Sequence, residues 1–350
     1  MVKFGVFADL HVDIMHDAQW RLETFIEACR MENVDFIIQL GDFSYPDENR
    51  KCVCRPELQP VNIKNALKSK TLADKEAIIS MFNNFEKPSF HVLGNHECDM
   101  CSKQETLDYY HMKHGSFYSF DMCGFHFVII DASYYKINGQ YIAFENGNYF
   151  EASYNYSQGD GEGERLLPWV PEEELEWLKE DLANAKFPTV LFSHQCLSEE
   201  DDFGVLNAKE IKKILKSAPF GVVAAFNGHE HMDYEQYQDG IWFVNINSIS
   251  CCWIDKDFIC YGLYGQEIDE KYPNIKYTVP YKDPVFAIIT MDEKGIDIKG
   301  TKSECVGPTP EERGLYKKGS WWLNVNEGKR PLTPQILDRY LPFEKCEHVK

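Results

Sequence analysis

Residues 4–11 read FGVFADLH, an apolar run that ends in the polar triplet Asp-Leu-His. Phe and Val are frequent in strands, so the run predicts a short buried strand over 4–8. Apolar residues at helical spacings follow over 18–32, and a second apolar run over 34–40 stops at Gly-Asp. A strand, a helix and a second strand in succession predict an α/β fold.

The same pattern of an apolar run that stops at polar residues recurs later in the chain. Runs over 90–93, 189–192 and 222–226 end at Gly-Asn-His-Glu, Ser-His and Asn-Gly-His-Glu-His. Residues 62–85 and a segment that opens at Pro171 are expected to be helices, since Pro is favoured in a first turn. Further strands are expected over 116–120, 125–131, 241–246 and 284–291, the first two joined by a hairpin turn at 122–124.

The polar residues at these strand ends are candidate metal ligands. They are Asp9, His11, Asp42, Asn95, His194, His229 and His231. Taken singly, each has an ordinary explanation, because a His is often a hydrogen-bonded structural residue and Gly-Asp is a turn signal. In an open α/β architecture, however, functional groups gather where the carboxyl ends of strands meet loops. The ordered set therefore predicts that these distant residues converge on one site.

The donor types in this set indicate which metals the site would hold. Carboxylate, imidazole and amide oxygen donors suit Mn, Fe or Zn, whereas an all-oxygen shell would suit Mg or Ca better. Two such ions about 3.5 to 4 Å apart clamp an in-line displacement, and a bound water then loses a proton near neutral pH. The residue types therefore fit metal-assisted hydrolysis.

Five motifs occur in a fixed order, namely DLH at 9–11, GD at 41–42, GNHE at 94–97, His194 and GHEH at 228–231. Together they resemble the signature of the calcineurin-like metallophosphoesterase superfamily, over a stretch from residue 4 to about 250. The resemblance implies a four-layer αββα fold of the α/β class, a β-sandwich flanked by helices. It also implies a dinuclear metal centre at the C-terminal ends of the strands and a small-molecule phosphatase or phosphodiesterase activity.

The resemblance further implies a role for each residue. One ion would be bound by Asp9, His11, Asp42 and His231, and the other by Asp42, Asn95, His194 and His229, so that Asp42 bridges both. A metal-bridging hydroxide would attack phosphorus, while His96 would assist the leaving group without binding a metal. Asn95 and His96, together with Tyr45, would contact the substrate. Glu97 and Glu230 are expected to support the ligands by hydrogen bonding rather than to bind metal.

The charge of the chain narrows the choice of substrate. With 36 Lys+Arg against 56 Asp+Glu, the formal net charge is -20, which disfavours nucleic acids and anionic membranes as partners. Bound metal ions would instead supply positive charge for a small phosphoester. The arginine that Ser/Thr protein phosphatases carry after their second motif is absent, because Gly-Asp at 41–42 continues as FSYP. We therefore expect a small phosphomonoester, phosphodiester or nucleotide-type substrate.

Two alternatives stay open, a nuclease and a non-catalytic protein-binding scaffold of the same fold. A nuclease would have to hold DNA on a strongly acidic body. A scaffold would have lost ligands, whereas every expected ligand is present in this sequence. Metal content after purification and activity towards bis-p-nitrophenyl phosphate distinguish an enzyme from a scaffold.

Residues 134–170 are rich in Tyr, Asn and Gly without a clear period, and they are expected to form a long functional loop or insertion. Their tyrosines are Tyr134, Tyr135, Tyr141, Tyr149, Tyr154 and Tyr156. Stacking on a base or sugar beside the metals is one role for these rings. Packing the insertion onto the body is the other, and it is the commoner use of large aromatic side chains.

Twelve cysteines suggest disulfides until the N-terminus is considered. It lacks the apolar core of a signal peptide, and no apolar run reaches the roughly 18 residues of a membrane span. A cytoplasmic protein with reduced thiols is therefore expected. Cys52, Cys54, Cys98 and Cys101 follow the second and third motifs and would be the ligands of any structural zinc site. Because the CxC spacing of the first pair is unusual for zinc, reduced and unligated thiols are favoured.

The length of 350 residues fits either two domains or one elaborated domain. Because the motifs span about 250 residues, we expect one catalytic domain over 1–305 that includes the insertion at 134–170. Residues 306–350 are expected to be a C-terminal extension that wraps this domain. The sequence leaves the native substrate, the identity of the metals and the oligomeric state open.

Overall fold

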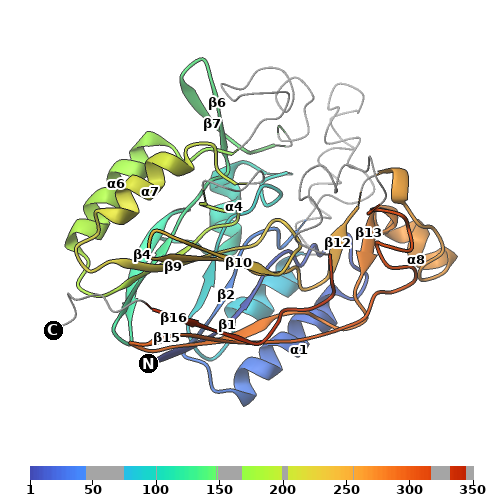
Figure 1. The fold of residues 1–350 in the computed structure, drawn as a ribbon. Coiled ribbons are helices and arrows are strands. Elements are labelled where there is room, and N and C mark those ends of the chain that lie inside the picture. The colour runs from blue at the N-terminus through green and yellow to red at the C-terminus, as the bar shows by residue number, and fades with distance from the viewer. Residues whose placement is uncertain are drawn as a thin grey trace.

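A computed structural model describes residues 1–44, 75–99, 101–146, 148, 168–198, 204–254, 256–316 and 332–343. Two six-stranded sheets lie face to face, and helices cover the outer face of each (Figure 1). This four-layer αββα arrangement of a β-sandwich flanked by helices confirms the predicted fold class.

The first sheet has the strand order β16-β15-β14-β1-β2-β3. Its parallel half consists of β1 (Val2–Phe7), β2 (Phe36–Gln39) and β3 (Ser89–His91). Its antiparallel half consists of β14 (Ala287–Met291), β15 (Gly295–Gly300) and β16 (Arg339–Pro342). The parallel half thus carries the first three strand ends at which polar residues are predicted to converge.

The second sheet has the strand order β10-β11-β9-β8-β5-β4. Its parallel centre consists of β5 (Phe125–Ile129), β8 (Thr189–Phe192), β9 (Val222–Asn227) and β11 (Ile241–Asn245). The antiparallel edge strands are β4 (Tyr118–Met122) and β10 (Tyr234–Gln238). The parallel strands are apolar on both faces because both faces are covered, which explains why they appear in the sequence as unbroken apolar runs.

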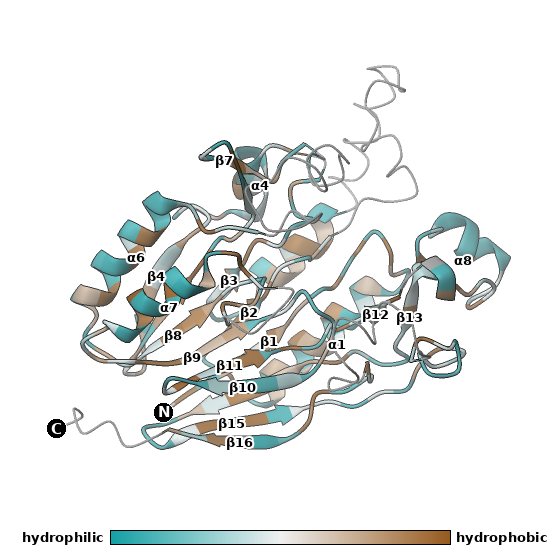
Figure 2. Cartoon of the chain, turned by 45° about the horizontal axis from the view of Figure 1, so that its top comes forward, coloured by the Kyte–Doolittle hydropathy of each residue, from teal (hydrophilic) through white to brown (hydrophobic). Residues whose placement is uncertain are grey.

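Three apolar clusters hold the layers together. The central cluster lies between the sheets and includes a stack of Phe4 on Phe36 with ring centroids 4.8 Å apart. Helix α1 (Ala18–Met31) buries Leu22 and Phe25 against the first sheet. Helices α6 (Glu172–Asn184) and α7 (Ala208–Lys216) cover the second sheet. In Figure 2 hydrophobic colour gathers on the inner strands, while α6, α7 and α8 carry much of the hydrophilic colour.

Smaller elements surround the strand ends. Helix α4 (Lys103–Tyr110) follows β3, and a hairpin of β6 (Tyr134–Ile137) and β7 (Gln140–Ala143) follows β5. A second two-stranded sheet pairs β12 (Cys251–Trp253) with β13 (Thr278–Pro280). The segment between them holds η3 (Lys256–Phe258), α8 (Gln266–Lys271) and η4 (Ile275–Tyr277).

Most of the elements expected from apolar patterning are present, with ends shifted by a few residues. The expected helix at Pro171 is α6, and its Leu175, Leu178 and Leu182 are buried. The expected hairpin joins β4 to β5 through Cys123 and Gly124, which have φ of 50° and 84°. Residues 75–83 of the expected helix over 62–85 are helical, and 62–74 lie outside the described residues.

The region over 134–170, expected to be a long functional loop or insertion, begins with regular structure. Residues 134–143 form the β6–β7 hairpin, and its turn is Asn138-Gly139, with φ of 50° and 77°. A two-residue Asn-Gly turn matches the twist of the flanking strands, since both residues adopt positive φ readily. Residue 147 and residues 149–167 lie outside the described residues.

The described part of the C-terminal region packs on the first sheet. Strand β16 adds to the edge of the sheet beside β15, and Leu332, Ile336 and Leu341 are buried in the central cluster. The division of the chain at residue 305 stays a prediction. Among the described residues, no helix is long and apolar enough to cross a membrane.

Candidate metal centre

The predicted ligands lie in the loops that follow the parallel strands. Backbone hydrogen bonds join these loops, because Asp9 N donates to Gly41 O (3.0 Å) and His11 N donates to Asp42 O (3.1 Å). Gly228 N donates to His194 O (3.0 Å) in the same way on the second sheet. Between the sheets, His229 N donates to Asp9 Oδ2 (3.0 Å), so the loops of both sheets meet at one edge of the sandwich.

A first cluster brings together Asp9, His11 and His231, whose candidate ligand atoms all lie within 4.8 Å of one another. His11 Nε2 lies 3.1 Å from His231 Nε2, and His231 Nε2 lies 3.3 Å from Asp9 Oδ1. All three side chains are buried. Residues separated by 220 positions thus form one compact set of nitrogen and oxygen donors.

A second cluster brings together Asp42, His194 and His229 within the same 4.8 Å limit. His194 Nε2 lies 3.3 Å from Asp42 Oδ2 and 3.2 Å from His229 Nδ1. Asn95 joins this cluster, since its Oδ1 lies 3.1 Å from His194 Nε2. The structure therefore places every predicted ligand in one of the two clusters. Their ligation of metal stays a prediction.

The histidines of the clusters are oriented by backbone carbonyls. His194 Nδ1 donates to Leu40 O (2.7 Å), and His231 Nδ1 donates to Cys251 O (2.6 Å). In each ring the second nitrogen, Nε2, is the one that faces its cluster. This is the usual arrangement of a metal-binding His, whose other nitrogen is held by a carbonyl or carboxylate.

Electrostatics favours a cation in the clusters. In the described part of the chain, the ion-pair partners of Asp9 and Asp42 are histidines and not lysine or arginine. Asp9 Oδ1 is buried and accepts no hydrogen bond among the described residues. A buried carboxylate is costly unless a positive charge compensates it. The carboxylate and imidazole donors therefore fit divalent transition-metal ions. Such ions would supply the positive charge that no lysine or arginine supplies to Asp9 and Asp42 in the described part of the chain.

Burial and neighbouring charge set the protonation of these groups. Burial, aided by His231, lowers the pKa of His11 to about 3. Burial opposes a charge on His194 as well, but Asp42 raises the pKa of His194 to about 9. Although burial disfavours an ionised carboxylate, His194 and His96 hold the pKa of Asp42 well below its usual range. Asp42 is thus an anion, and the proton on His194 would give way to a metal ion because ligand imidazoles are neutral.

The backbone at the candidate ligands adopts an uncommon conformation. Asp9, His11, Asp42, His229 and His231 have φ of 56°, 51°, 50°, 74° and 53°. Positive φ is rare for residues with a side chain, and it persists only where surrounding contacts enforce it. Such conformations gather at functional sites, which agrees with a site at this edge.

The motif glycines allow the loops to approach each other closely. A Cβ on Gly41 would lie 2.4 Å from His194 Nδ1, and one on Gly94 would lie 2.2 Å from Asp42 Oδ1. A Cβ on Gly228 would lie 2.6 Å from the Cβ of Ala8. The glycines of the GD, GNHE and GHEH motifs are therefore required by space, beyond any role as turn signals.

Glu97 fastens the loop of Asp42 to the loop of Asn95. Its Oε2 accepts hydrogen bonds from Asp42 N (3.0 Å) and Gly94 N (2.6 Å), and its Oε1 accepts one from Phe43 N (2.7 Å). Burial and the neighbouring Asp42 raise the pKa of Glu97 to about 8. The carboxyl group of Glu97 thus holds the backbone around the site, as expected from the sequence. Glu230 likewise accepts a hydrogen bond, from the Tyr234 hydroxyl.

His96 lies at the same edge and is held by a residue that the sequence analysis missed. Its Nδ1 lies 2.8 Å from Asp99 Oδ2, and its backbone N donates to Asp42 Oδ1 (3.0 Å). The ring centroids of His96 and His11 are 6.3 Å apart. The hydrogen bond from Asp99 to Nδ1 therefore orients the imidazole of His96 at this edge. The His-x-x-Asp spacing at 96–99 was the signal available in the sequence.

Trp253 is a second residue that sequence reasoning did not single out. Its ring centroid lies 5.8 Å from that of His11 and 6.3 Å from that of His231. Strand β12 carries it to the first cluster from a segment to which the sequence assigned no role. No local motif marks Trp253, because its position depends on the pairing of β12 with β13.

The described tyrosines of the 134–170 region make packing contacts. Tyr135 is fully buried with its ring centroid 5.6 Å from that of Phe144. Tyr141 contacts Trp169 at 6.4 Å, and the ring of Tyr134 lies under Lys103 Nζ at 3.7 Å. These contacts favour packing over substrate stacking for the three rings. Tyr149, Tyr154 and Tyr156 lie outside the described residues, as does Tyr45.

The four cysteines that would be the ligands of any structural zinc site are only partly described. Cys98 and Cys101 are buried, Cys98 is a free thiol, and burial raises the pKa of Cys98 to about 12. A thiol with so high a pKa is protonated at neutral pH and is a poor metal ligand. Cys52 and Cys54 lie outside the described residues.

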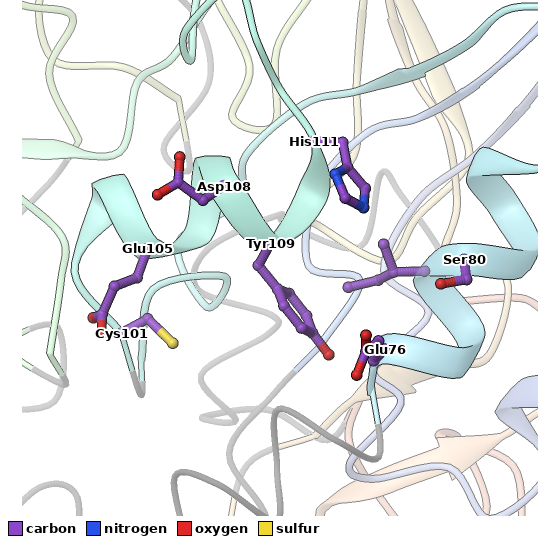
Figure 3. Close-up of a pocket in the computed structure, with 8 residues that line it drawn as sticks. Glu76, Ser80, Cys101, Glu105, Asp108, Tyr109 and His111 are labelled. Carbon is purple, nitrogen blue, oxygen red and sulfur yellow. The ribbon is translucent and has the colours of Figure 1, made fainter.

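A cavity of about 390 Å³ lies apart from the candidate metal ligands, between α4 and the helical residues 75–83 (Figure 3). Figure 3 shows Tyr109 extending from α4 towards Glu76. The cavity is lined by Glu76, Ile79, Ser80, Cys101, Glu105, Asp108, Tyr109 and His111. None of the predicted metal ligands lines it, so this cavity is separate from the candidate metal centre.

Comparison with known families agrees with this site. Residues 2–233 match the family described as calcineurin-like phosphoesterase. The chain belongs to this family. It is therefore a hydrolase that acts on phosphoester bonds, in a class of dinuclear metal enzymes. The match spans all of the motifs quoted from the sequence. No curated protein matches the chain.

The chain is also similar to several solved structures. A dimetal phosphatase from Danio rerio has a TM-score of 0.58 and 17% sequence identity, covering 87% of this chain and 98% of that chain. GAP50, the anchor in the inner membrane complex of Plasmodium, has a TM-score of 0.49 and 14% identity, covering 98% and 89%. The purple acid phosphatase PPD1 from yellow lupin (Lupinus luteus) seeds has a TM-score of 0.43 and 13% identity, covering 87% and 51%. At these identities, the first structure supports a shared fold.

Proposed function

We propose that the chain hydrolyses a small phosphomonoester, phosphodiester or nucleotide-type substrate with two transition-metal ions, Mn, Fe or Zn. One observation carries the proposal, namely that two clusters of carboxylate and imidazole donors, all buried except the half-buried His229, lie at one edge of the sandwich. Asp42 belongs to the second cluster, and its charge also acts on His11 of the first. This position supports Asp42 as the residue that bridges both ions.

The ions, when bound, supply Lewis acidity towards the phosphoryl oxygens and a nucleophile at neutral pH. Asp9, His11 and His231 would hold one ion, and His194, His229 and Asn95 the other. Asp42 would serve both ions, because its Oδ2 lies 3.3 Å from His194 Nε2 and its charge also acts on His11.

His96 would donate a proton to the leaving group from Nε2. Asp99 holds Nδ1 at 2.8 Å and so fixes the ring and its tautomer. The backbone bond from His96 to Asp42 ties the proton donor to the bridging ligand. Asp99 is thus a positioning residue, and His96 is the group that touches the substrate.

The proposal includes the class of partner and the compartment. Apart from the metal ions, the described ligand shell has no cationic side chain that would attract a polyanion. This supports a small substrate over a nucleic acid or an anionic membrane. Seven described cysteines are free thiols, which supports the reducing cytoplasm as the location; they are Cys29, Cys98, Cys123, Cys251, Cys252, Cys260 and Cys305.

The experiment that tests the proposal compares wild-type protein with Asp42→Asn. We expect about two ions per wild-type chain by elemental mass spectrometry, and metal-dependent release of p-nitrophenol from its phosphate mono- or diester. Asp42→Asn should bind fewer ions and lose turnover, because a neutral amide is a poor bridge between cations. Full activity in Asp42→Asn would refute the mechanism. A wild-type chain that is inactive and binds little metal would favour the alternative of a non-catalytic protein-binding scaffold.

A further inference from the structure

The first metal cluster is held by the loop that follows β11, here called the support loop (residues 247–251). Ser248 Oγ donates to Asp9 O (2.9 Å), and Ser250 Oγ donates to Leu10 O (2.8 Å). The carbonyl of Cys251 accepts the hydrogen bond from His231 Nδ1. The support loop therefore ties the two halves of the first cluster together, although it contributes no ligand.

The C-terminal region accepts hydrogen bonds from Asn247, the first residue of the support loop. Asn247 is fully buried, and its Nδ2 donates to Thr333 O (2.7 Å) and Gln335 O (3.1 Å). The hydroxyl of Tyr281 donates to Asn247 Oδ1 (3.1 Å). The carboxamide of Asn247 is thus fully used in fixing the support loop to residues 333–335.

The same region grips the chain just after His231. Asp233 Oδ2 accepts a hydrogen bond from Leu337 N (2.9 Å). The guanidinium of Arg339 pairs with Asp233 and with Glu235, and its side chain is only 13% exposed. A planar fork that pairs with two carboxylates fixes direction as well as distance. His231 is therefore restrained from both sides, through the support loop and through Asp233.

Residues 332–339 are themselves held by backbone hydrogen bonds and by burial. Ile336 N donates to Thr301 O (2.9 Å), and Ser303 N donates to Pro334 O (2.7 Å). Ile336 is fully buried in the central cluster. Residues 332–339 are thus part of the packed body rather than a loose tail.

We propose that residues 332–339 act as a brace that sets the metal affinity of the Asp9–His11–His231 cluster, with Arg339 as its main positioning residue. This inference rests on the proposed function, because it requires two resident ions. The second cluster is held differently, since His194 is bound to Leu40 O and the Asp42 loop to Glu97. Disrupting the contacts of residues 332–339 should therefore lower the affinity for the ion of the first cluster much more than the affinity for the other ion.

The test measures ions per chain by elemental mass spectrometry after equilibration with a graded series of chelator concentrations. In Arg339→Ala we expect one of the two ions to leave at about 10-fold lower chelator, in line with the loss of an outer hydrogen-bond partner. Arg339→Lys, which keeps one charge but not the fork, should shift in the same direction by less. The matched control is Arg30→Ala, which breaks an exposed pair with Glu86 and should leave both ions at their wild-type midpoints.

Two further variants identify the ion that leaves. In a His11→Ala background the first cluster is already impaired, so adding Arg339→Ala should change the remaining midpoint little. In a His194→Ala background, adding Arg339→Ala should lower the chelator midpoint of the remaining ion by about 10-fold. Circular dichroism of the metal-free chains checks folding. If Arg339→Ala does not fold, the graded shift in Arg339→Lys carries the test.

The outcomes separate the brace from the proposed function. If the wild-type chain binds two ions and Arg339→Ala releases both at wild-type chelator concentrations, the brace is overturned and the hydrolase proposal stands. An equal loss of affinity for both ions would also overturn the brace proposal, because the proposal requires an effect selective for the first cluster. A wild-type chain that binds no ions would overturn the proposed function itself.

Discussion

Replacing Gly94 by alanine should disable the site through a single added methyl group. The new Cβ would lie 2.2 Å from Asp42 Oδ1, 2.4 Å from Asp42 N and 2.8 Å from Glu97 Oε2. Ordinary contact begins at 3.4 Å, so Asp42 must retreat by about 1.2 Å, the difference between 3.4 and 2.2 Å. A misplacement of about 1 Å costs on the order of 100-fold in rate. We therefore expect kcat/KM to fall about 100-fold, or about 2.7 kcal/mol of transition-state stabilisation.

The assay for Gly94→Ala combines initial rates on p-nitrophenyl phosphate esters, ions per chain and thermal unfolding. Gly5→Ala is the matched control, because its Cβ would lie equally close, at 2.2 Å, to Cys29 Sγ in the apolar layer under α1. Both variants should lose about 1 to 3 kcal/mol of stability from overpacking. Gly5→Ala should nevertheless keep its kcat/KM at temperatures where it is folded. Wild-type kcat/KM and metal content in Gly94→Ala would refute the reasoning.

Two further expectations follow from side chains with defined partners. His96→Ala should keep both ions but lower kcat by about 100-fold or more, the scale of general-acid catalysis, and the loss should be smallest on esters whose leaving group needs no proton. An equal loss on all leaving groups would contradict proton donation by His96. His126 lies between Asp121 and Asp181 at 2.7 and 2.8 Å, and although burial opposes its charge, Asp181 and Asp121 raise its pKa. Its stabilisation should be complete below the unfolded-state value near pH 6.5 and should be lost as pH rises through the folded value. Chemical denaturation should show this loss in wild type and not in His126→Gln; the same pH slope in both would contradict it.

The convergence of the predicted ligands could be foreseen from the sequence because each ligand follows a strand directly. Asp9 comes two residues after β1 and Asp42 three residues after β2, and parallel strands place their carboxyl ends at the same edge. Buried parallel strands appear as plain apolar runs, so their ends are visible without knowledge of the fold. The β6–β7 hairpin could also have been found, since Asn138-Gly139 is a strong turn signal.

The residues that support the ligands could not be predicted in the same way. Ser248 and Arg339 act on groups that lie 239 and 106 residues away in the chain, Asp9 and Asp233. Nothing in their local sequence distinguishes them from an ordinary loop serine or a surface arginine. Their roles arise from strand pairing at the sheet edges, which local apolar periodicity does not specify. The role of Asp99 was partly predictable. Its spacing from His96 was visible in the sequence, but the contact between His96 Nδ1 and Asp99 Oδ2 was needed to decide it.

The acidic charge of the chain and its phosphoester chemistry are compatible because they act over different distances. The formal charge of -20 is spread over the whole body and repels extended polyanions. Asp9 and Asp42 are buried, and their charge is felt mainly by the histidines around them. Two divalent ions would change the net charge only from -20 to -16, but they would make this edge locally positive. A small phosphoester approaching within the screening length, about 8 Å at physiological salt, would therefore be attracted, while a long polyanion would still meet an acidic surface.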